Sequence, residues 1–221
     1  AGQPTGTREV VLKIAAKHPD MAGAGALLKE ISGLGLATPA GLSIFAGSRA
    51  KPSPVVRLFS FLIPKADVPV SLDVDGAQTT HEGTQGDVFA ADLVARPDGL
   101  DAPDLSDAVE VPLVQLAWGR SGDKGNKANI GIIARKADYL PYIWAALDDA
   151  AIRDRFGHFM AADSGFERYL LPGCHAMNIL IHEALGGGGV ASLRNDPQGK
   201  AYAQILLDHP VPVSREIAES L

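Results

Sequence analysis

A polar, glycine-rich segment between two apolar runs restricts the fold of this chain more than any other part of its sequence. Residues 109–118 alternate as a strand does, and residues 130–134 form a compact apolar run, so both are predicted to be strands. The eleven residues between them, 119–129, contain three glycines and six charged or amide side chains. They are predicted to be a long loop that connects the two strands.

The charge of this segment suggests a role for it. Its bases Arg120, Lys124 and Lys127 and its acid Asp123 give it a net charge of +2 in a chain whose net charge is −6. Because glycine lets backbone N–H groups turn toward a bound anion, this combination predicts binding of a phosphate or carboxylate. The alternative is a long β-hairpin whose glycines serve only the turn and whose charges are solvated. The length of the segment favours the functional loop.

The rest of the second half supplies helices and strands in alternation. We expect a helix over residues 140–156 that starts near Pro141, and an extended segment over 159–171. A second helix over 174–185 is closed by four glycines, and a last strand follows over 201–207. The resulting order, ββαβαβ, predicts an α+β fold, a ferredoxin-like two-layer sandwich with the helices on one face of the sheet.

The first half predicts a smaller α/β segment. Strands are expected over residues 8–16, 56–63 and 68–74, with a helix that Asp20 caps and Gly33 ends. From residue 67 to 110 the chain has eleven acids and one base, and prolines and glycines interrupt the apolar pattern. We therefore expect three parts, namely residues 1–75, an acidic linker over 76–108, and a domain over 109–221.

Three polar residues of the helix expected at 174–185 fall on one face: His175, Asn178 and His182. His175 is a candidate general acid or base, and Asn178 is a candidate partner for a carbonyl group or an adenine. The alternative, a capping or packing role, has equal weight for His175 and is favoured for His182. The two histidines cannot share a metal ion, because about 10 Å of helix separates them, so no metal site is predicted.

Composition narrows the partners. Lysine and arginine total 20 against 26 acids, and a protein that binds nucleic acid normally has the opposite balance, so nucleic acid is not an expected partner. The chain has no apolar run long enough for a membrane span and opens with no signal peptide or methionine, so we expect a cytoplasmic piece of a longer polypeptide. The single cysteine, Cys174, excludes an internal disulfide and agrees with that compartment.

Four stretches of the second half resemble the acyclic terpene utilisation protein family AtuA. They are Leu116–Arg135, Tyr169–Asn178, Glu183–Gly188 and Ser192–Lys200. With the residues between them they cover essentially all of residues 109–207, a region that is similar to the small ferredoxin-like domain of that family. The first half resembles, less specifically, the end of the family's larger domain, which implies that most of that domain lies upstream of Ala1.

The resemblance also implies a function. The name of the family implies a role in the breakdown of acyclic terpenes such as citronellol and geraniol, which proceeds through coenzyme A thioesters. The expected ligand is therefore a small anion, either an acyl-CoA or a carboxylated terpenoid, and the chain is expected to be part of an acyl-CoA-processing enzyme of the lyase or hydratase kind. The alternative is a noncatalytic module through which the chain forms a homo-oligomer. No motif assigns a cofactor.

The site residues implied by the resemblance are its motif positions. The expected catalytic residues are Asp123, Lys124 and His175. Asp123 and His175 are the acid and base candidates, and Lys124, together with Arg120, is a candidate contact for the anion. The positions expected to bind substrate are Arg120, Ser121, Asn126, Asn129 and Asn178.

Overall fold

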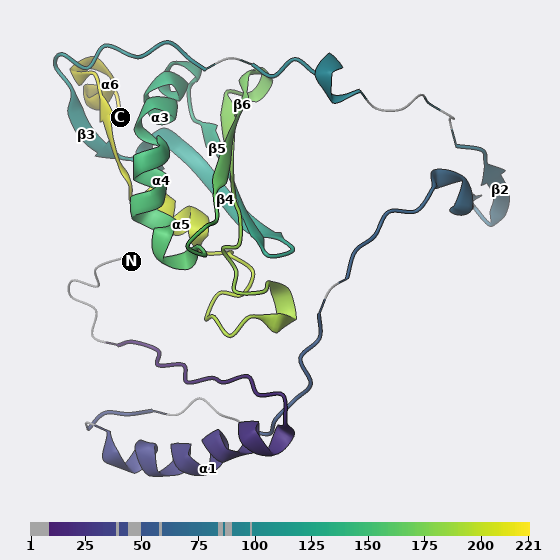
Figure 1. Cartoon of the computed structure of the whole chain (residues 1–221). Helices are drawn as coiled ribbons and strands as arrows, with labels where there is room; N and C mark the ends of the chain where they lie inside the picture. The colour runs from purple at the N-terminus through teal and green to yellow at the C-terminus, as the bar shows by residue number, and fades with distance from the viewer. Residues whose placement is uncertain are drawn as a thin grey trace. The chain divides into compact units, whose positions relative to one another are not determined.

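The computed structural model describes residues 9–38, 40–43, 50–57, 59–83, 86, 90–97 and 99–221 (Figure 1). The chain divides into two compact units, of which one combines Ala1–Arg57 with Gly99–Leu221 and the other is Leu58–Asp98. Parts of the acidic linker expected over 76–108, including residues 87–89, lie outside the described residues. The three-part division expected from the sequence stays a prediction.

The second half is built on a four-stranded sheet in which every neighbouring pair is antiparallel. Its strands are β4 (Ala117–Lys124), β5 (Lys127–Ala134), β6 (Phe166–Leu171) and β7 (Ala176–Ile181), in the order β4-β5-β7-β6. β5 and β6 therefore run in the same direction on either side of β7, and the helices α3 (Leu140–Ala146) and α4 (Asp149–Phe156) connect them. This split β-α-β arrangement confirms the expected ferredoxin-like α+β fold.

Two further strands bring the ends of this region together. β3 (Val109–Pro112) pairs antiparallel with β8 (Pro210–Val213), and the backbone N–H of Leu113 donates to the carbonyl of His209 at 2.9 Å. The helices α2 (Leu113–Leu116) and α5 (Tyr202–Leu207) lie between these strands in the sequence, and α6 (Arg215–Glu219) follows β8. Figure 1 shows β3 and α6 beside each other at one side of the domain.

The core lies on one face of the four-stranded sheet. Alternate residues of β5 and β7 are fully buried there, and the helices supply the other side of the core with residues such as Ile143, Ile152 and Leu206. The buried strand residues are Ala128, Ile130, Ile132, Met177, Ile179 and Ile181. In Figure 1, α3 and α4 lie against this side of the sheet. Because successive strand residues point to opposite faces, the residues between the buried ones face away from the helices.

The first half contains less regular structure than expected. The helix α1 (Met21–Ala37) is capped by Asp20, whose carboxylate accepts from the N–H of Ala22 at 2.9 Å, but it ends at Ala37 instead of Gly33. The strand expected at 68–74 is confirmed as β1 (Val70–Val74), which pairs with β2 (Ala77–His81) through a turn. The described residues of 8–16 and 56–63 form no strand, because no described segment pairs with them.

The segment at 119–129 is a hairpin and not a long loop. β4 continues through Lys124, β5 begins at Lys127, and only Gly125 and Asn126 remain for the turn. Gly125 has φ +67°, which a two-residue hairpin turn requires and glycine allows. The segment is therefore a hairpin, as in the alternative, but only Gly125 serves the turn, because Gly119 and Gly122 lie within β4.

Two further elements differ from the prediction. Residues 174–185, expected as a helix, contain β7, and residues 201–207, expected as a strand, contain α5. The short apolar run in β7 fits a helix as well as a strand. Only its pairing with β5, which is distant in the sequence, decides between the two. In α5 the buried residues Tyr202, Ala203 and Leu206 have the spacing of one helix face. In the sheet, the position at the edge next to β5 is occupied by β4 and not by residues 201–207.

A buried hydroxyl joins the edge strand β4 to α5. Ser121 is 8% exposed, and its hydroxyl donates to the carbonyl of Lys200 at 3.0 Å and accepts from the N–H of Ala203 at 2.9 Å. Both partners belong to the backbone around the start of α5. The side chain of Ser121 therefore pairs with one N–H that the first turn of α5 leaves free and with a carbonyl just before the helix.

Replacing this hydroxyl should weaken the fold. We expect Ser121→Ala to lower the free energy of unfolding by about 1–3 kcal/mol, because it leaves two polar backbone groups without a partner. The matched control is Lys124→Ala on the exposed end of the same strand, which should change it by less than about 0.5 kcal/mol. Urea unfolding followed by circular dichroism measures both. Equal midpoints for Ser121→Ala and the unmodified chain would contradict this role.

Candidate functional site

The face of the four-stranded sheet that points away from the helices forms the candidate site. We call it the open sheet face. It consists of the residues that alternate with the buried ones on all four strands. These are Trp118, Arg120, Gly122, Lys124, Lys127, Asn129, Gly131, Ile133, Glu167, Tyr169, Leu171, Ala176, Asn178 and Leu180.

The register places these residues in rows across the strands. One row is apolar: Trp118 lies opposite Ile133, and the row continues through Ala176 to Leu171. Trp118 is 55% exposed, Ile133 48% and Leu171 43%. Ala176, the member of this row on β7, is buried. Three exposed apolar residues in one row, on β4, β5 and β6, are unusual for a solvated sheet face and indicate a contact surface.

The adjoining rows become polar and then basic. The next row joins Arg120 and Gly131 to Asn178 and Tyr169, and the one after it contains Asn129 and Glu167. The paired ends of β4 and β5 bring Lys124 opposite Lys127. Successive rows are two residues apart along a strand, about 7 Å, so the basic end lies about 20 Å from the apolar row.

Three of the residues predicted to bind substrate lie together on this face. The side-chain amide of Asn129 donates to the side-chain oxygen of Asn178 at 2.7 Å, and both residues are partly buried. This pairing leaves the oxygen of Asn129 and the amide nitrogen of Asn178 without a hydrogen bond to any described residue. Arg120, in the same row as Asn178, is exposed and makes no ion pair with a described residue. The three can offer a cation, a donor and an acceptor to one ligand.

The other predicted site residues lie elsewhere. The hydroxyl of Ser121 is used in the link to α5, and Asp123, on the same side of β4, lies 3.8 Å from the ammonium of Lys200. Asn126 holds the hairpin turn to the glycine run, because its side chain donates to Glu183 and accepts from the N–H of Gly187 at 2.7 Å. In these positions their visible roles are structural.

The three predicted catalytic residues are not brought together. His175 is exposed in a left-handed turn with φ +49° immediately before β7, next to the apolar row. Lys124 is at the opposite, basic end of the sheet, and its ammonium donates to the carbonyl of Asp123 at 3.0 Å. About 20 Å of strand separates His175 from Lys124. A single small substrate therefore does not reach both in this arrangement.

Sequence reasoning missed a connected group on the open sheet face. The hydroxyl of Tyr169 donates to one oxygen of Glu167, and the other oxygen lies 2.8 Å from Nε2 of His182, just past the end of β7. The alternation of Glu167 with Tyr169 in an extended segment already placed both on one face. Their closeness to His182 depends on the pairing of β6 with β7, which the sequence does not display.

Glu167 is the charged centre of this group. The hydrogen bond from Tyr169, and after it the one from His182, holds the pKa of Glu167 below its ordinary value of 4.5. A carboxylate that fixes Nε2 of an imidazole leaves Nδ1 available to exchange a proton. The described residues contain no group of three side chains suited to hold a metal ion. The side chains of this face are of types that can contact an anion and exchange a proton.

Comparisons with known proteins agree with the fold. The family described as the AtuA ferredoxin-like domain matches residues 111–212, which include the four-stranded sheet. The family described as acyclic terpene utilisation family protein AtuA matches residues 2–74. No curated protein and no solved structure matches the chain. In the described part of the chain, no helix has the length and apolar character needed to cross a membrane.

The lowered pKa of Glu167 predicts a pH dependence of stability. A carboxyl group whose pKa is lower in the folded chain stabilises it above the ordinary pKa of 4.5, and this contribution is lost as the pH falls through the lowered value. We therefore expect the unmodified chain to lose more stability than Glu167→Gln when the pH is lowered through this range. Urea unfolding at a series of pH values measures the difference, with Glu219→Gln on α6 as the control. Parallel curves for the unmodified chain and Glu167→Gln would contradict the network.

Proposed function

Since the chain belongs to the acyclic terpene utilisation family AtuA and its role is linked to that process, we propose that its open sheet face binds an acyl-CoA or a carboxylated terpenoid. The observation that carries this proposal is the order of the rows, from apolar through amide and arginine to lysine. A terpenoid acyl-CoA has the same order of groups, because a hydrocarbon chain is followed by a carbonyl and then by phosphates.

Each part of the face has a partner in such a ligand. The apolar row of Trp118, Ile133 and Leu171 contacts the hydrocarbon chain, and burial of this exposed area favours binding. Arg120 and the amide nitrogen of Asn178 donate to the carboxylate or thioester carbonyl. Gly131, between them in the same row, has no side chain that would keep a ligand away from the sheet. Lys124 and Lys127 are placed for the phosphates of coenzyme A.

Proton transfer on this face does not involve Asp123 and His175, the acid and base candidates expected from the sequence. A lyase or hydratase acting on an acyl chain needs a group that takes up and releases a proton. In our proposal this group is His182, whose ring is oriented by Glu167, and Tyr169 holds Glu167 in place by donating to its carboxylate. His175 and Asp123 would need to move to reach a ligand on the open sheet face.

A homo-oligomer formed through the same face is the second candidate. The exposed apolar row favours it, because a second copy of the chain could cover Trp118, Ile133 and Leu171 as well as a ligand could. Ligand binding and homo-oligomer formation differ in the role of Arg120. A bound anion needs its positive charge, whereas a packed apolar interface does not. Light scattering with and without ligand separates them.

Binding of geranoyl-CoA tests the proposal. Isothermal titration should show that Arg120→Ala weakens binding by about tenfold or more, because a hydrogen bond to a charged group contributes about 1.5–3 kcal/mol. Arg155→Ala, on α4 at the covered side of the sheet, is the matched control and should leave the affinity within about twofold. The proposal fails if the unmodified chain does not bind geranoyl-CoA, or if both variants bind it equally well. A change in oligomer mass for Trp118→Ala without a change in affinity would support the second candidate.

A further inference from the structure

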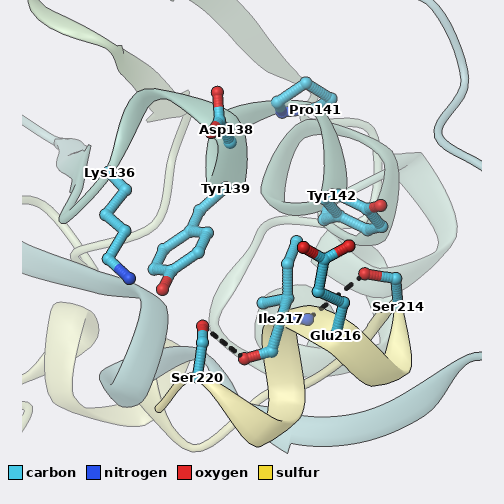
Figure 2. Close-up of a pocket in the computed structure, with 9 residues that line it drawn as sticks. All are labelled: Lys136, Asp138, Tyr139, Pro141, Tyr142, Ser214, Glu216, Ile217 and Ser220. Carbon is cyan, nitrogen blue, oxygen red and sulfur yellow. Dashed lines mark hydrogen bonds between the residues drawn. The ribbon is translucent and has the colours of Figure 1, made fainter.

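A pocket outside the open sheet face contains a second group of polar side chains. It has a volume of about 570 Å³, within the range of small-molecule sites, and lies between α6 and the short 3-10 helix η3 (Ala137–Tyr139) that leads into α3. Figure 2 shows the side chains that line it. None of them belongs to the strands of the four-stranded sheet, so the pocket is separate from the site proposed above.

The phenol of Tyr139 is the unusual feature of this pocket. Tyr139 is only 3% exposed, and its buried hydroxyl makes no hydrogen bond to any residue that the structure describes. Buried polar groups nearly always have a partner, so a hydroxyl of this kind in a pocket wall points to a bound group. In Figure 2 the hydroxyl is directed toward the ammonium of Lys136 and the hydroxyl of Ser220.

Two polar side chains, those of Lys136 and Ser220, lie beside the phenol (Figure 2). The ammonium of Lys136 lies 5.3 Å from the centre of the Tyr139 ring and forms no ion pair with a described residue. The hydroxyl of Ser220 already donates to the carbonyl of Ile217 at 2.9 Å. The closeness of the side chain of Lys136 first, and then of that of Ser220, lowers the pKa of Tyr139, while burial and the charge of Asp138 act in the opposite direction. An ammonium and a phenol directed toward each other can share one anionic oxygen group.

We infer that this pocket binds the carboxylate of a small monocarboxylic acid, with Tyr139 and Lys136 as the donors. The hydrocarbon part of the acid rests on Tyr142 and Ile217, which line the same pocket. Asp138 and Glu216 also line it, and their charges repel a phosphate dianion more strongly than an anion of single charge. Lys136 is exposed, so its side chain can rotate and admit the carboxylate to the phenol.

Benzoate is the probe for this site, because it combines one carboxylate with a compact apolar ring. In isothermal titrations of the full chain, Tyr139→Phe and Lys136→Gln should each weaken benzoate binding by about tenfold, since each removes a hydrogen bond to a charged group. Tyr142→Phe is the matched control, because it removes a phenol from the same pocket but not from the donor pair, and it should change the affinity less than about twofold. Inorganic phosphate should bind more weakly than benzoate.

Thermal unfolding of the same variants provides an independent measurement. Because the phenol of Tyr139 has no partner in the unliganded chain, Tyr139→Phe should melt at the same temperature as the unmodified chain or higher, and benzoate should raise the melting temperature of the unmodified chain more than that of the variant. The inference is overturned if the unmodified chain does not bind benzoate, if Tyr139→Phe and Lys136→Gln retain full affinity, or if phosphate binds more tightly. A lower melting temperature for Tyr139→Phe would overturn it as well, because the phenol would then have a partner within the protein.

Discussion

The four-stranded sheet is covered on one face only, and most of what the second half of the chain can do follows from this. Burial of alternate residues of β5 and β7 beneath α3, α4 and α5 fixes which side chains of each strand face the helices. A shift of one residue in any pairing would expose the buried isoleucines, so the register is firmly held. The remaining residues are thereby ordered into the rows of the open sheet face.

This alternation separates residues that are neighbours in the sequence. Arg120 and Ser121 are adjacent, but Arg120 faces outward and Ser121 is buried in its contact with α5. The motif at 119–129 therefore has two faces. Residues on the buried face, such as Ser121, stabilise the fold, and residues on the outward face, such as Arg120, are available to a ligand.

Much of the fold could be predicted from local patterns. The α+β class, the helical character of residues 140–156, the Asp20 cap of α1 and the strand at β1 all depend on neighbours in the sequence, although residues 140–156 form two helices and not the one expected. The assignments of β7 and α5 failed because short apolar runs fit either element, and only the distant pairing with β5 decides between them. The local pattern at 119–129 indicates a loop, because the polar outward residues of the hairpin mask the alternation of a strand.

The candidate site was predictable to a smaller extent. Arg120, Asn129 and Asn178 were found through their residue types and the family resemblance, and they share the open sheet face. The sequence does not indicate Glu167 and favours a capping or packing role for His182, since the two meet only through the pairing of β6 with β7. The grouping of Asp123 and Lys124 with His175 follows from motif positions, which do not fix distances across the sheet. Once β7 is placed, His175 lies at the other end of the sheet.

The central claim is that the open sheet face is the ligand-binding surface, and NMR mapping of the isotope-labelled full chain tests it most directly. On addition of geranoyl-CoA, the claim predicts shifts of amide signals along the outward rows, from Trp118 and Ile133 through Asn129 and Asn178 to Lys127, with the signals of α3 and α4 unchanged. Shifts confined to α3, α4 and α6, with the strand signals unchanged, would contradict it.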